Sequence, residues 1–316
     1  MSLNAFLSND FKAVQSIIES EISPDKVLIK KKSYDLFLYG GKKIRQTFTL
    51  LVGKLGNKKY AQDILKIAAS LELIHMATLV HDDIIDDSDV RRGHITVYYS
   101  EGYNQAILTG NYLLSIALKL SSEVDNMELH RVYAQAIQTI VEGELNQFEQ
   151  QFNADITKEA YFEKTYRKTA LLIETSVALG AIASHLQHEL KEKLMRYAYH
   201  IGMSFQIIDD CLDFIGIESE IGKPKFSDLK NGHYTLPVIL LRDKDPSFHE
   251  QLHQYSKQLI QVDDIINAIL DSGVIDEALS VSNQHIDEAI VAIDGIDDEI
   301  KHYLIEFAEK LQKRIS

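Results

Sequence analysis

Aspartates gather at the end of an apolar stretch, residues 71–93, which reads LELIHMATLVHDDIIDDSDVRRG. We expect a helix here. Residues three or four apart share one helix face, so Asp82 and Asp86 should be neighbours with Asp83 beside them. Carboxylates held this close repel one another and are costly to desolvate beside apolar residues. A divalent cation relieves both costs, and oxygen ligands with room for water and phosphate suit Mg²⁺. A solvated acidic face is the alternative for a single motif of this kind.

A second copy of this pattern occurs in residues 205–214, FQIIDDCLDF, where Asp209, Asp210 and Asp213 have the same spacing. Two copies make a solvated acidic face the weaker explanation. We expect two helices that face each other, with Mg²⁺ between their carboxylates and a diphosphate bridged to the protein by the ions. Cys211 lies inside this motif, and its expected role is that of a small buried apolar side chain rather than a catalytic thiol.

A cationic segment precedes the first motif at residues 39–45, YGGKKIR. Glycines before a helix let the backbone amides approach an anion, and Lys42 and Arg45 share a face of the helix that follows. This arrangement suits a second diphosphate held by cations, although a glycine turn with two surface cations is the alternative. His75 lies two helical turns before Asp82 and could donate to the same diphosphate, or it could be an ordinary core histidine.

Two arginines follow the first motif. Arg91 and Arg92 could recognise phosphate through bidentate hydrogen bonds, or they could pair with the neighbouring aspartates. We expect Gly93 to end the helix.

Lys168 and Thr169 lie in a largely apolar helical stretch, where a buried lysine needs a counter-charge such as a phosphate oxygen. Gln206 lies one turn before Asp210 and can donate into the same space. Residues 221–237 form the clearest loop of the sequence, and Lys223 lies in this loop, which could close over a ligand as a lid.

The composition favours long helices in one domain. The chain has 316 residues, 45% of them apolar, and no proline occurs between positions 25 and 223, a span rich in helix-forming residues. We expect an all-α fold and a single domain, 1–316. We expect a turn at residues 109–111, followed by a helix that runs to about Ser121. Further helices are expected over residues 127–150 and 157–186, and three or four more over residues 248–316.

Charge and cysteine content limit the classes of function. The net charge of −14 is unfavourable for nucleic-acid binding, and a single cysteine excludes an internal disulfide and fits a reducing compartment. No signal peptide is visible. The longest apolar segment, residues 64–85, is interrupted by Lys66, Glu72, His75 and His81. We therefore expect a cytoplasmic protein.

Over residues 30–316 the chain resembles the trans-isoprenyl diphosphate synthases, also called the polyprenyl synthetase family. The resemblance lies in the motifs GGKKIR, the first DDxxD with RRG after it, GELNQ, KTA, FQIIDD with its DxxD extension, GKP, SDL and TLP. It implies a bundle of long antiparallel helices around a deep cavity. It also implies an enzyme that condenses isopentenyl diphosphate with an allylic diphosphate such as farnesyl diphosphate.

The resemblance also implies a role for each candidate residue. Asp82 and Asp86, supported by Asp83, would bind Mg²⁺, and Asp209, assisted by Asp210 and Asp213, would hold a third ion. Isopentenyl diphosphate would be bound by Lys42, Arg45, His75 and Arg92. The allylic diphosphate would be bound by Arg91, Lys168, Thr169, Gln206 and Lys223.

Three positions depart from the family pattern. Gln46 replaces a proline, Asn111 replaces the aspartate of a G-D-[FY] turn, and His233 stands where many members carry a lysine that contacts the allylic diphosphate. None of the three removes an expected metal ligand. His233 could make allylic binding weaker or sensitive to pH.

The residues before Asp82 predict the product length. Short-chain members carry an aromatic residue five positions before the first aspartate, whereas this chain has Ala77, followed by Thr78. The channel for the growing chain should then stay open at least to Ile74, unless a residue such as Tyr133 forms its floor. We expect a medium-to-long product used as a quinone side chain, with heptaprenyl diphosphate as the best single expectation and a geranylgeranyl synthase as the alternative.

The resemblance implies a homodimer, or a heterodimer with a small regulatory subunit, with at most peripheral membrane contact for product release. A terpene cyclase would leave the cationic set around Lys42 without a role, and a non-enzymatic regulatory subunit typically lacks the aspartate motifs. A di-iron helical bundle is the alternative from another class, because Glu72–His75 and Glu250–His253 match its Glu-x-x-His spacing. That reading leaves both aspartate motifs unexplained.

Overall fold

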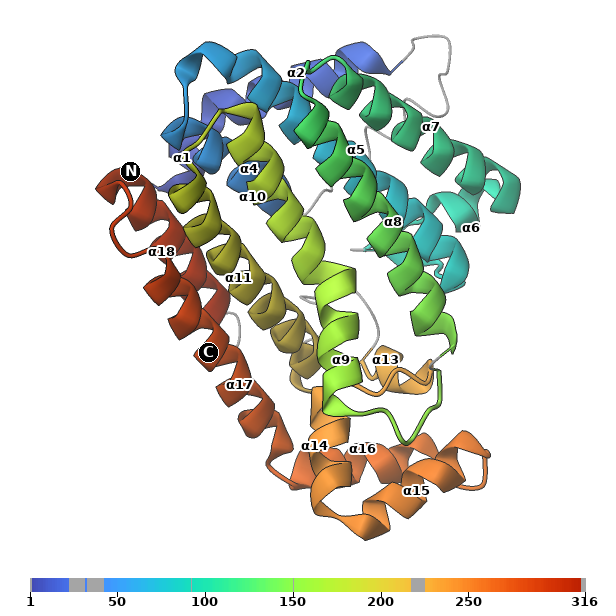
Figure 1. Cartoon of the computed structure of the whole chain (residues 1–316). Helices are drawn as coiled ribbons and strands as arrows, with labels where there is room; N and C mark the ends of the chain where they lie inside the picture. The colour runs from blue at the N-terminus through green and yellow to red at the C-terminus, as the bar shows by residue number, and fades with distance from the viewer. Residues whose placement is uncertain are drawn as a thin grey trace. The chain divides into compact units, whose positions relative to one another are not determined.

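The computed structural model describes residues 2–22, 32, 43–91, 93–149, 151–216 and 225–313, apart from the side chains of 144 and 146–149. Lys42, Arg92 and Lys223, three of the predicted substrate ligands, lie outside the described residues. Nearly all regular structure in the described part is helical, and one pair of two-residue strands is the exception (Figure 1). The prediction of an all-α fold is confirmed.

The chain divides into two compact units. Unit 1 contains Met1–Gln135, Thr175–Met195 and Ile296–Tyr303, and unit 2 contains Ala136–Glu174, Arg196–Gly295 and Leu304–Ser316. Four of the five boundaries between them fall inside helices, namely α8 (Met127–Glu149), α10 (Leu171–Ala183), α11 (His188–Ile215) and α18 (Asp298–Gln312). The fifth, between Gly295 and Ile296, lies just before α18.

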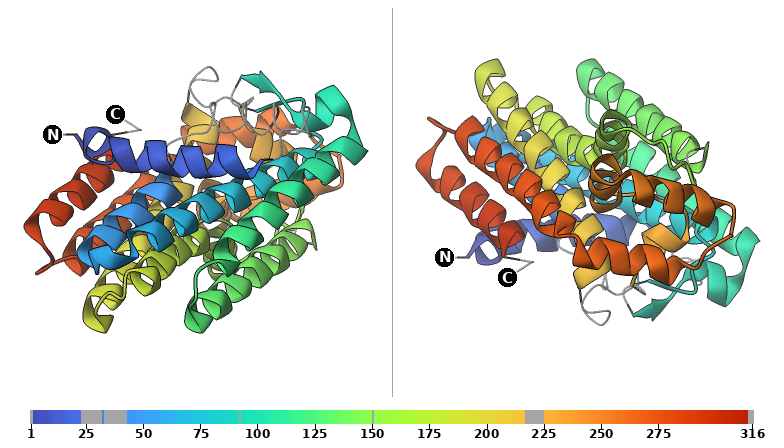
Figure 2. Two further views of the ribbon diagram at one scale, coloured as in Figure 1. Left: turned by 90° about the horizontal axis from the view of Figure 1, so that it is seen from above. Right: turned by 90° about the horizontal axis from the view of Figure 1, so that it is seen from below.

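Helix α5 (Ala61–Ile85) forms the core of unit 1. Its apolar residues are distributed around the whole helix, and a helix of this kind must be buried on most faces. It lies side by side with α2 (Ser8–Glu21), α4 (Ile44–Leu55) and α7 (Tyr103–Ser122) (Figures 1 and 2). The short helices of this unit are α1 (Leu3–Phe6), η1 (Lys58–Tyr60) and α6 (Val97–Glu101).

By length and composition, the helical segment Lys58–Ile85 could also cross a membrane. However, 67% of its most apolar window is buried inside the fold. A membrane span of this composition would present that surface to lipid, so burial identifies the segment as a core helix.

The turn predicted at residues 109–111 is wrong, because these residues lie inside α7. A side chain at Gly110 would collide with the ring of His81 on α5. Gly110 therefore allows two helices to approach closely rather than allowing the chain to turn. Asn111 also lies inside α7, where it is exposed, and is not part of a G-D-[FY] turn.

Gly93 also has a different role from the one predicted. Helix α5 ends at Ile85, eight residues earlier, and the chain then forms the antiparallel strands β1 (Val90–Arg91) and β2 (His94–Ile95). Gly93 lies between these strands with a φ of 77°, a conformation that glycine adopts at little steric cost. It makes a hairpin turn instead of ending a helix.

The helical run predicted over residues 157–186 starts in unit 2. The Thr157 hydroxyl accepts a hydrogen bond from Ala160 N (3.1 Å) and caps α9 (Lys158–Thr165). A π-helical turn, η2 (Tyr166–Ala170), then joins α9 to α10.

The remainder of unit 2 confirms the helices expected towards the C-terminus. Helices α14 (Leu236–Lys244), α15 (Pro246–Ser256) and α16 (Val262–Asp271) pack together (Figure 1). They are followed by α17 (Val274–Ala292) and α18, so that four helices span the region where three or four were predicted. Before them, a single helical turn, α13 (Ser227–Lys230), lies in the predicted loop.

Candidate functional site

The first aspartate motif lies where α5 ends. Asp86 is the residue at which the helix stops, and its N–H still donates to the carbonyl of Asp82 (2.8 Å), so the two residues are one turn apart as predicted. Asp82 is half-buried and Asp86 is exposed, whereas Asp83 is buried. Asp82 and Asp86 therefore remain accessible to an ion, and Asp83 points into the protein.

The buried Asp83 carboxylate pairs with Arg91 of the hairpin. Arg91 Nε donates to Asp83 Oδ1 at 2.5 Å, and Ser88 N donates to the Asp83 carbonyl at 2.9 Å. Arg91 thus makes the aspartate pairing that the sequence left open as an alternative to phosphate binding. The pair joins the hairpin to the end of α5.

The second aspartate motif lies near the end of α11. Asp209 is half-buried, while Asp210 and Asp213 are buried. Asp213 accepts hydrogen bonds from Ser227 Oγ (3.0 Å) and Asp228 N (3.2 Å). Its carboxylate therefore fixes the start of α13, which the sequence did not predict.

Asp210 is held by a chain of hydrogen bonds that includes two predicted residues. Tyr161 OH and Gln206 Nε2 each donate to its carboxylate at 2.7 Å, and Thr169 Oγ1 donates to Gln206 Oε1 at 2.5 Å. Burial, followed by the nearby charge of Asp228, raises the pKa of Asp210 to about 7. A cation bound beside this carboxylate would favour its ionised form.

The close approach of two helices brings Thr169 opposite Gln206. A side chain at Gly202 of α11 would collide with Ala170 at the end of η2, so glycine lets the two segments touch. Thr169 lies next to Ala170, and Gln206 lies one turn after Gly202. The π-helical turn contains one more residue than an α-helical turn would, and such insertions are frequent at functional sites.

A small polar pocket in unit 2 is lined by Gln206 and Asp210 and by two lysines, among other residues. Its lining consists of Tyr161, Lys164, Thr165, Lys168, Gln206, Asp210, Asp228, His233 and Thr235. The predicted residue Lys168 is exposed, and the departure His233 is buried in this lining. Sequence reasoning missed Tyr161, Lys164 and Asp228. A signal for Tyr161 and Lys164 was present, because both share a helix face with Lys168.

The predicted cationic set before the first motif is described only in part. Arg45 is half-buried in the first turn of α4, and the preceding Lys43 has a φ of 50°. His75 is half-buried on α5. Gln46, the departure next to Arg45, is fully buried, and neither its amide nitrogen nor its amide oxygen has a hydrogen-bond partner among the described residues.

The side chains predicted to control product length lie on α5. Ile74 and Ala77 are buried, and Thr78 is half-buried with its hydroxyl donating to the carbonyl of His75 (2.9 Å).

Closer to the N-terminus of α5, Ser70 Oγ contacts the hydroxyl of Tyr133 on α8. Ser70 Oγ also lies 2.6 Å from the carbonyl of Ala117 on α7. Ser70 is twelve positions before Asp82 (82 − 70), which corresponds to about 18 Å along a helix.

Comparison with known proteins gives consistent results in sequence and structure. The polyprenyl synthetase family model matches residues 26–272. Heptaprenyl diphosphate synthase component 2 of Bacillus subtilis is 37% identical over 290 residues, which cover 90% of this chain and 82% of that protein.

Two crystal structures extend this likeness to the fold. Heptaprenyl diphosphate synthase from Staphylococcus aureus superposes with a TM-score of 0.93 at 37% identity, covering 100% of this chain and 99% of that one. A polyprenyl synthase from Caulobacter crescentus, complexed with calcium and isoprenyl diphosphate, has a TM-score of 0.92 at 28% identity, with 99% and 97% covered.

Proposed function

The chain belongs to the polyprenyl synthetase family and is a trans-prenyltransferase, and we propose that it adds isopentenyl diphosphate units to an allylic diphosphate such as farnesyl diphosphate. The observation that carries this proposal is the likeness over nearly the whole chain to proteins named heptaprenyl diphosphate synthase. Both aspartate motifs are present in full, which disfavours a non-enzymatic subunit. A terpene cyclase or a di-iron protein is not supported by any of these relatives.

We propose Mg²⁺ as the cofactor, with three ions per active site. Asp82 and Asp86, with Asp83 in support, and Asp209 with its neighbours Asp210 and Asp213 supply only carboxylate oxygens, the ligands that Mg²⁺ prefers. When bound, the ions stabilise negative charge on the departing diphosphate. The structure supports a division of labour, because Asp82 and Asp86 are accessible while the buried carboxylates are held by protein donors.

The lysine-lined pocket supports allylic diphosphate binding in unit 2. Lys168 and Lys164 supply positive charge next to His233, and Thr169 and Gln206 hold Asp210 through hydrogen bonds. Cations placed where charge develops on a leaving group lower the barrier to ionisation. The proposed roles of Arg91 and Lys223 at this diphosphate rest on the family resemblance.

Isopentenyl diphosphate is not ionised in this reaction, so its ligands need only bind and orient it. We assign this role to Lys42, Arg45, His75 and Arg92, on the family resemblance. Its C=C bond attacks the allylic cation and a proton is lost, which the released diphosphate can accept. Water would quench the cation, and apolar side chains around the reacting carbons exclude it.

We propose heptaprenyl diphosphate as the product, which would serve as a quinone side chain. The names of the relatives support this length, as does the small side chain of Ala77. Tyr133 and Ser70 contact each other about 18 Å along α5 from Asp82, and we propose this contact as the floor of the channel. The shorter geranylgeranyl product would need a bulky residue closer to Asp82.

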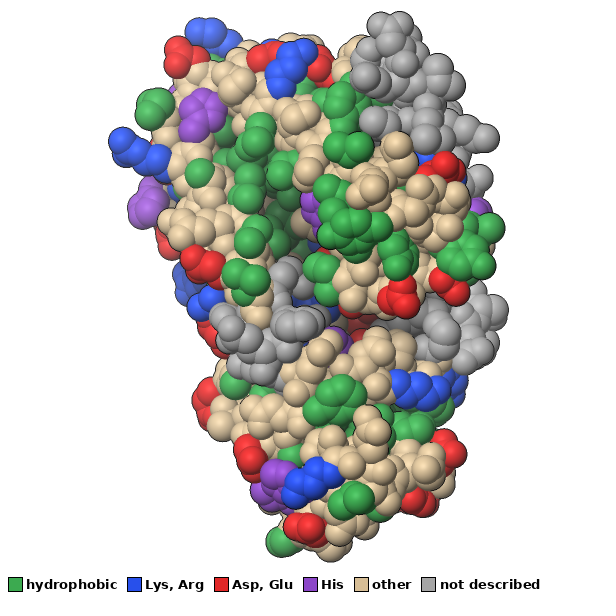
Figure 3. Space-filling model, turned by 90° about the vertical axis from the view of Figure 1, so that its right-hand side faces the viewer, with side chains coloured by type: hydrophobic (Ala, Val, Ile, Leu, Met, Phe, Trp, Pro, Cys, Tyr) green, Lys and Arg blue, Asp and Glu red, His purple; other side chains and the backbone are tan. Residues whose placement is uncertain are grey.

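We further propose a dimer, either of two copies or with a small regulatory subunit. The relative from Bacillus subtilis is named component 2, which indicates a partner in that system. Exposed apolar side chains gather at several places on one face of the molecule (Figure 3). Unit 1 contributes large ones from α6 and α7, namely Tyr99, Tyr103, Leu108 and Leu118. The burial of α5 supports a cytoplasmic enzyme with at most peripheral membrane contact.

The experiment that tests this function combines labelled isopentenyl diphosphate, farnesyl diphosphate and Mg²⁺, with and without a chelator. Products are dephosphorylated and separated by length, and we expect heptaprenol only when Mg²⁺ is free. The assay is repeated with the small subunit of a related two-component synthase. Absence of any chelator-sensitive prenyl product under both conditions would contradict the proposal.

A further inference from the structure

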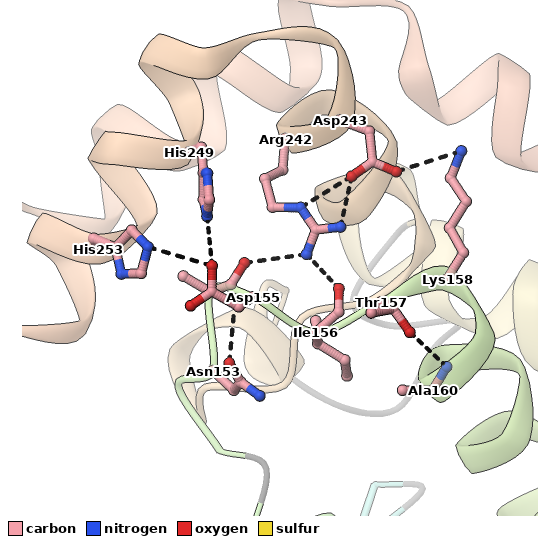
Figure 4. A network of polar contacts seen from close by, with 11 residues as sticks. Asn153, Asp155, Ile156, Thr157, Lys158, Ala160, Arg242, Asp243, His249 and His253 are labelled. Carbon is pink, nitrogen blue, oxygen red and sulfur yellow. Dashed lines mark hydrogen bonds and ion pairs between the residues drawn. The ribbon is translucent and has the colours of Figure 1, made fainter.

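A second polar cluster lies in unit 2 and shares no residue with the proposed active site. It consists of Asp155, in the segment between α8 and α9, and of His249 and His253 on α15 (Figure 4). One ligand atom from each residue lies within 4.8 Å of the other two.

The geometry of this cluster resembles a set of metal ligands. Both histidines direct their Nε2 atoms at Oδ1 of Asp155, at 2.9 Å from His249 and 3.5 Å from His253. Ligand atoms around a tetrahedral zinc ion are separated by about 3.3 Å, because each lies about 2.0–2.1 Å from the metal. The two separations from Asp155 bracket this value, and no two of the three ligand atoms are more than 4.8 Å apart, so side-chain rotations would admit an ion.

Helix α15 positions the two histidines independently of any ion. His249 and His253 are four residues apart and share one face of the helix. Phe248 and Leu252 share the adjacent face and are buried in the core. The Asp245 side chain accepts from Ser247 N (2.8 Å) and caps the helix, so that its first turn, next to His249, is fixed.

The segment that carries Asp155 is also held from outside the cluster. Arg242 of α14 donates from Nη1 to the carbonyls of Ala154 (3.1 Å) and Ile156, the two neighbours of Asp155 (Figure 4). The Asn153 side chain accepts from Asp155 N (3.0 Å). The backbone on both sides of Asp155 is therefore ordered while its carboxylate points at the histidines.

We propose that Asp155, His249 and His253 bind one Zn²⁺ ion, with water completing the coordination. Two imidazoles and one carboxylate suit Zn²⁺, whereas Mg²⁺ requires oxygen ligands. The ion would join α15 to the segment that leads into α9. Glu250 is not among the converging residues, so His253 belongs to this site rather than to a Glu-x-x-His di-iron motif.

The test titrates the metal-free full chain with Zn²⁺ against a chromophoric chelator, in millimolar Mg²⁺ that occupies the carboxylate motifs. We expect one tight Zn²⁺ equivalent in the wild-type protein. Loss of an outer-sphere partner of a ligand costs about 10–100-fold in metal affinity, so loss of a ligand in His253→Ala should cost more than about 100-fold. Asp155→Asn should weaken binding in the same direction.

The matched control is His188→Ala. His188 is an exposed helical histidine 4.0 Å from the carboxylate of Glu192, with no second histidine in that ion pair. It should bind Zn²⁺ as the wild type does, and circular dichroism should show all variants folded. The proposal is overturned if the wild type binds no Zn²⁺ in excess Mg²⁺, as expected for histidines that merely contact Asp155. It is equally overturned if His253→Ala retains the wild-type affinity.

Discussion

At the scale of residues, the two aspartate motifs differ in how their carboxylates are held. The first two aspartates of each motif match in burial, half-buried and then buried, but the buried carboxylates have different donors, Arg91 for Asp83 and Tyr161 for Asp210. The last aspartates differ, because Asp86 is exposed whereas Asp213 is buried and accepts from Ser227. This difference cannot be read from two motifs with the same spacing. It depends on Tyr161 and Ser227, which lie 49 and 14 positions away from the carboxylates they contact.

Removing one accessible carboxylate should abolish activity without unfolding the protein. We expect Asp82→Ala to reduce the rate of prenyl transfer by at least about 100-fold, because charge on the leaving diphosphate loses stabilisation. The melting temperature should stay the same or rise, since carboxylate repulsion is relieved in the metal-free protein. Steady-state kinetics and thermal melting check both parts, with the exposed Asp125→Ala as control. Substantial residual turnover in Asp82→Ala would contradict the assignment.

Gln46 leads to a prediction about stability. A buried amide without hydrogen bonds costs about 1–3 kcal/mol, and both polar atoms of Gln46 lack partners among the described residues. Gln46→Met keeps the volume and removes this cost, so the free energy of unfolding should rise by about 1–2 kcal/mol. Denaturant unfolding measures it, with the exposed Gln138→Met as control. A less stable Gln46→Met with a raised KM for isopentenyl diphosphate would show instead that the amide binds substrate.

At the scale of elements, helix α5 sets the product length in our proposal. Ala77→Tyr places a ring in the channel and should shift the main product to a shorter chain while ionisation continues. Tyr133→Ala removes the ring that contacts Ser70 and should lengthen the product. Chromatography of the dephosphorylated products measures both shifts. An unchanged length in Ala77→Tyr would disprove the channel along α5, whereas an unchanged length in Tyr133→Ala alone would disprove only the floor.

A pair of histidines joins α11 to α17 and should make the fold sensitive to acid. His200 Nδ1 and His285 Nδ1 are 3.0 Å apart, near Glu288, Arg196 and Tyr199. Burial, and then the charge of His200, lowers the pKa of His285 to about 4, and burial lowers that of His200. Two protonated rings would place two N–H donors against each other, so at least one ring must stay neutral for the contact to persist.

The sign of the pH effect follows from these lowered pKa values. The unfolded chain binds protons at His285 below its ordinary pKa of 6.5, whereas the folded protein binds them only near pH 4. The contribution is therefore complete above pH 6.5 and is lost as the pH falls towards 4. Allowing for partial exposure, we expect the free energy of unfolding to fall by about 1–2 kcal/mol, and His285→Leu to reduce this fall. Urea unfolding at several pH values measures it, and identical slopes in both proteins would contradict the prediction.

The helices could largely be predicted from the sequence, and the short elements could not. Long runs of helix-forming residues without proline indicated the helices over 127–150 and 157–186. The π-helical turn inside the second run left no signal, because its extra residue fits the same composition. Gly93 and Gly110 were misread, since a glycine signals either a turn or a close helix contact, and only the packed structure distinguishes the two.

The candidate site could be predicted in residue type more completely than in geometry. Spacing identified Gln206 and Asp210, and the apolar stretch around Lys168 identified Thr169; the structure joins these three residues by hydrogen bonds. Sequence reasoning could not place Tyr161 against Asp210, because this contact depends on how α9 packs beside α11. It also could not decide whether Arg91 contacts phosphate or an aspartate.

At the scale of the whole molecule, the family match bears on our proposal for the domain organisation. The polyprenyl synthetase model matches residues 26–272, a span with residues from both compact units. We propose that the two units together form one domain of this family. The boundaries of the units inside α8, α10, α11 and α18 are consistent with this view, because a continuous helix is not a linker between domains.

The exposed apolar face of α7 leads to a prediction about the oligomeric state. Leu108 and Leu118 of α7 are 55% and 45% exposed, and covering apolar surface of this kind with a partner is favourable. We expect the protein to sediment as a dimer at micromolar concentration, alone or with a small regulatory subunit. The double change Leu108→Glu and Leu118→Glu should shift it to the monomer, because charged residues are costly to bury in the centre of an interface.

The matched control is Val291→Glu, which alters a more exposed apolar residue on α17 (70%) and should leave the dimer intact. Both sites are exposed in the single chain, so neither change should reduce helicity or the melting temperature of the monomer. If the wild type sediments as a monomer with and without the subunit, the protein functions without a dimer. If the α7 variant and the wild type associate equally, another surface forms the interface.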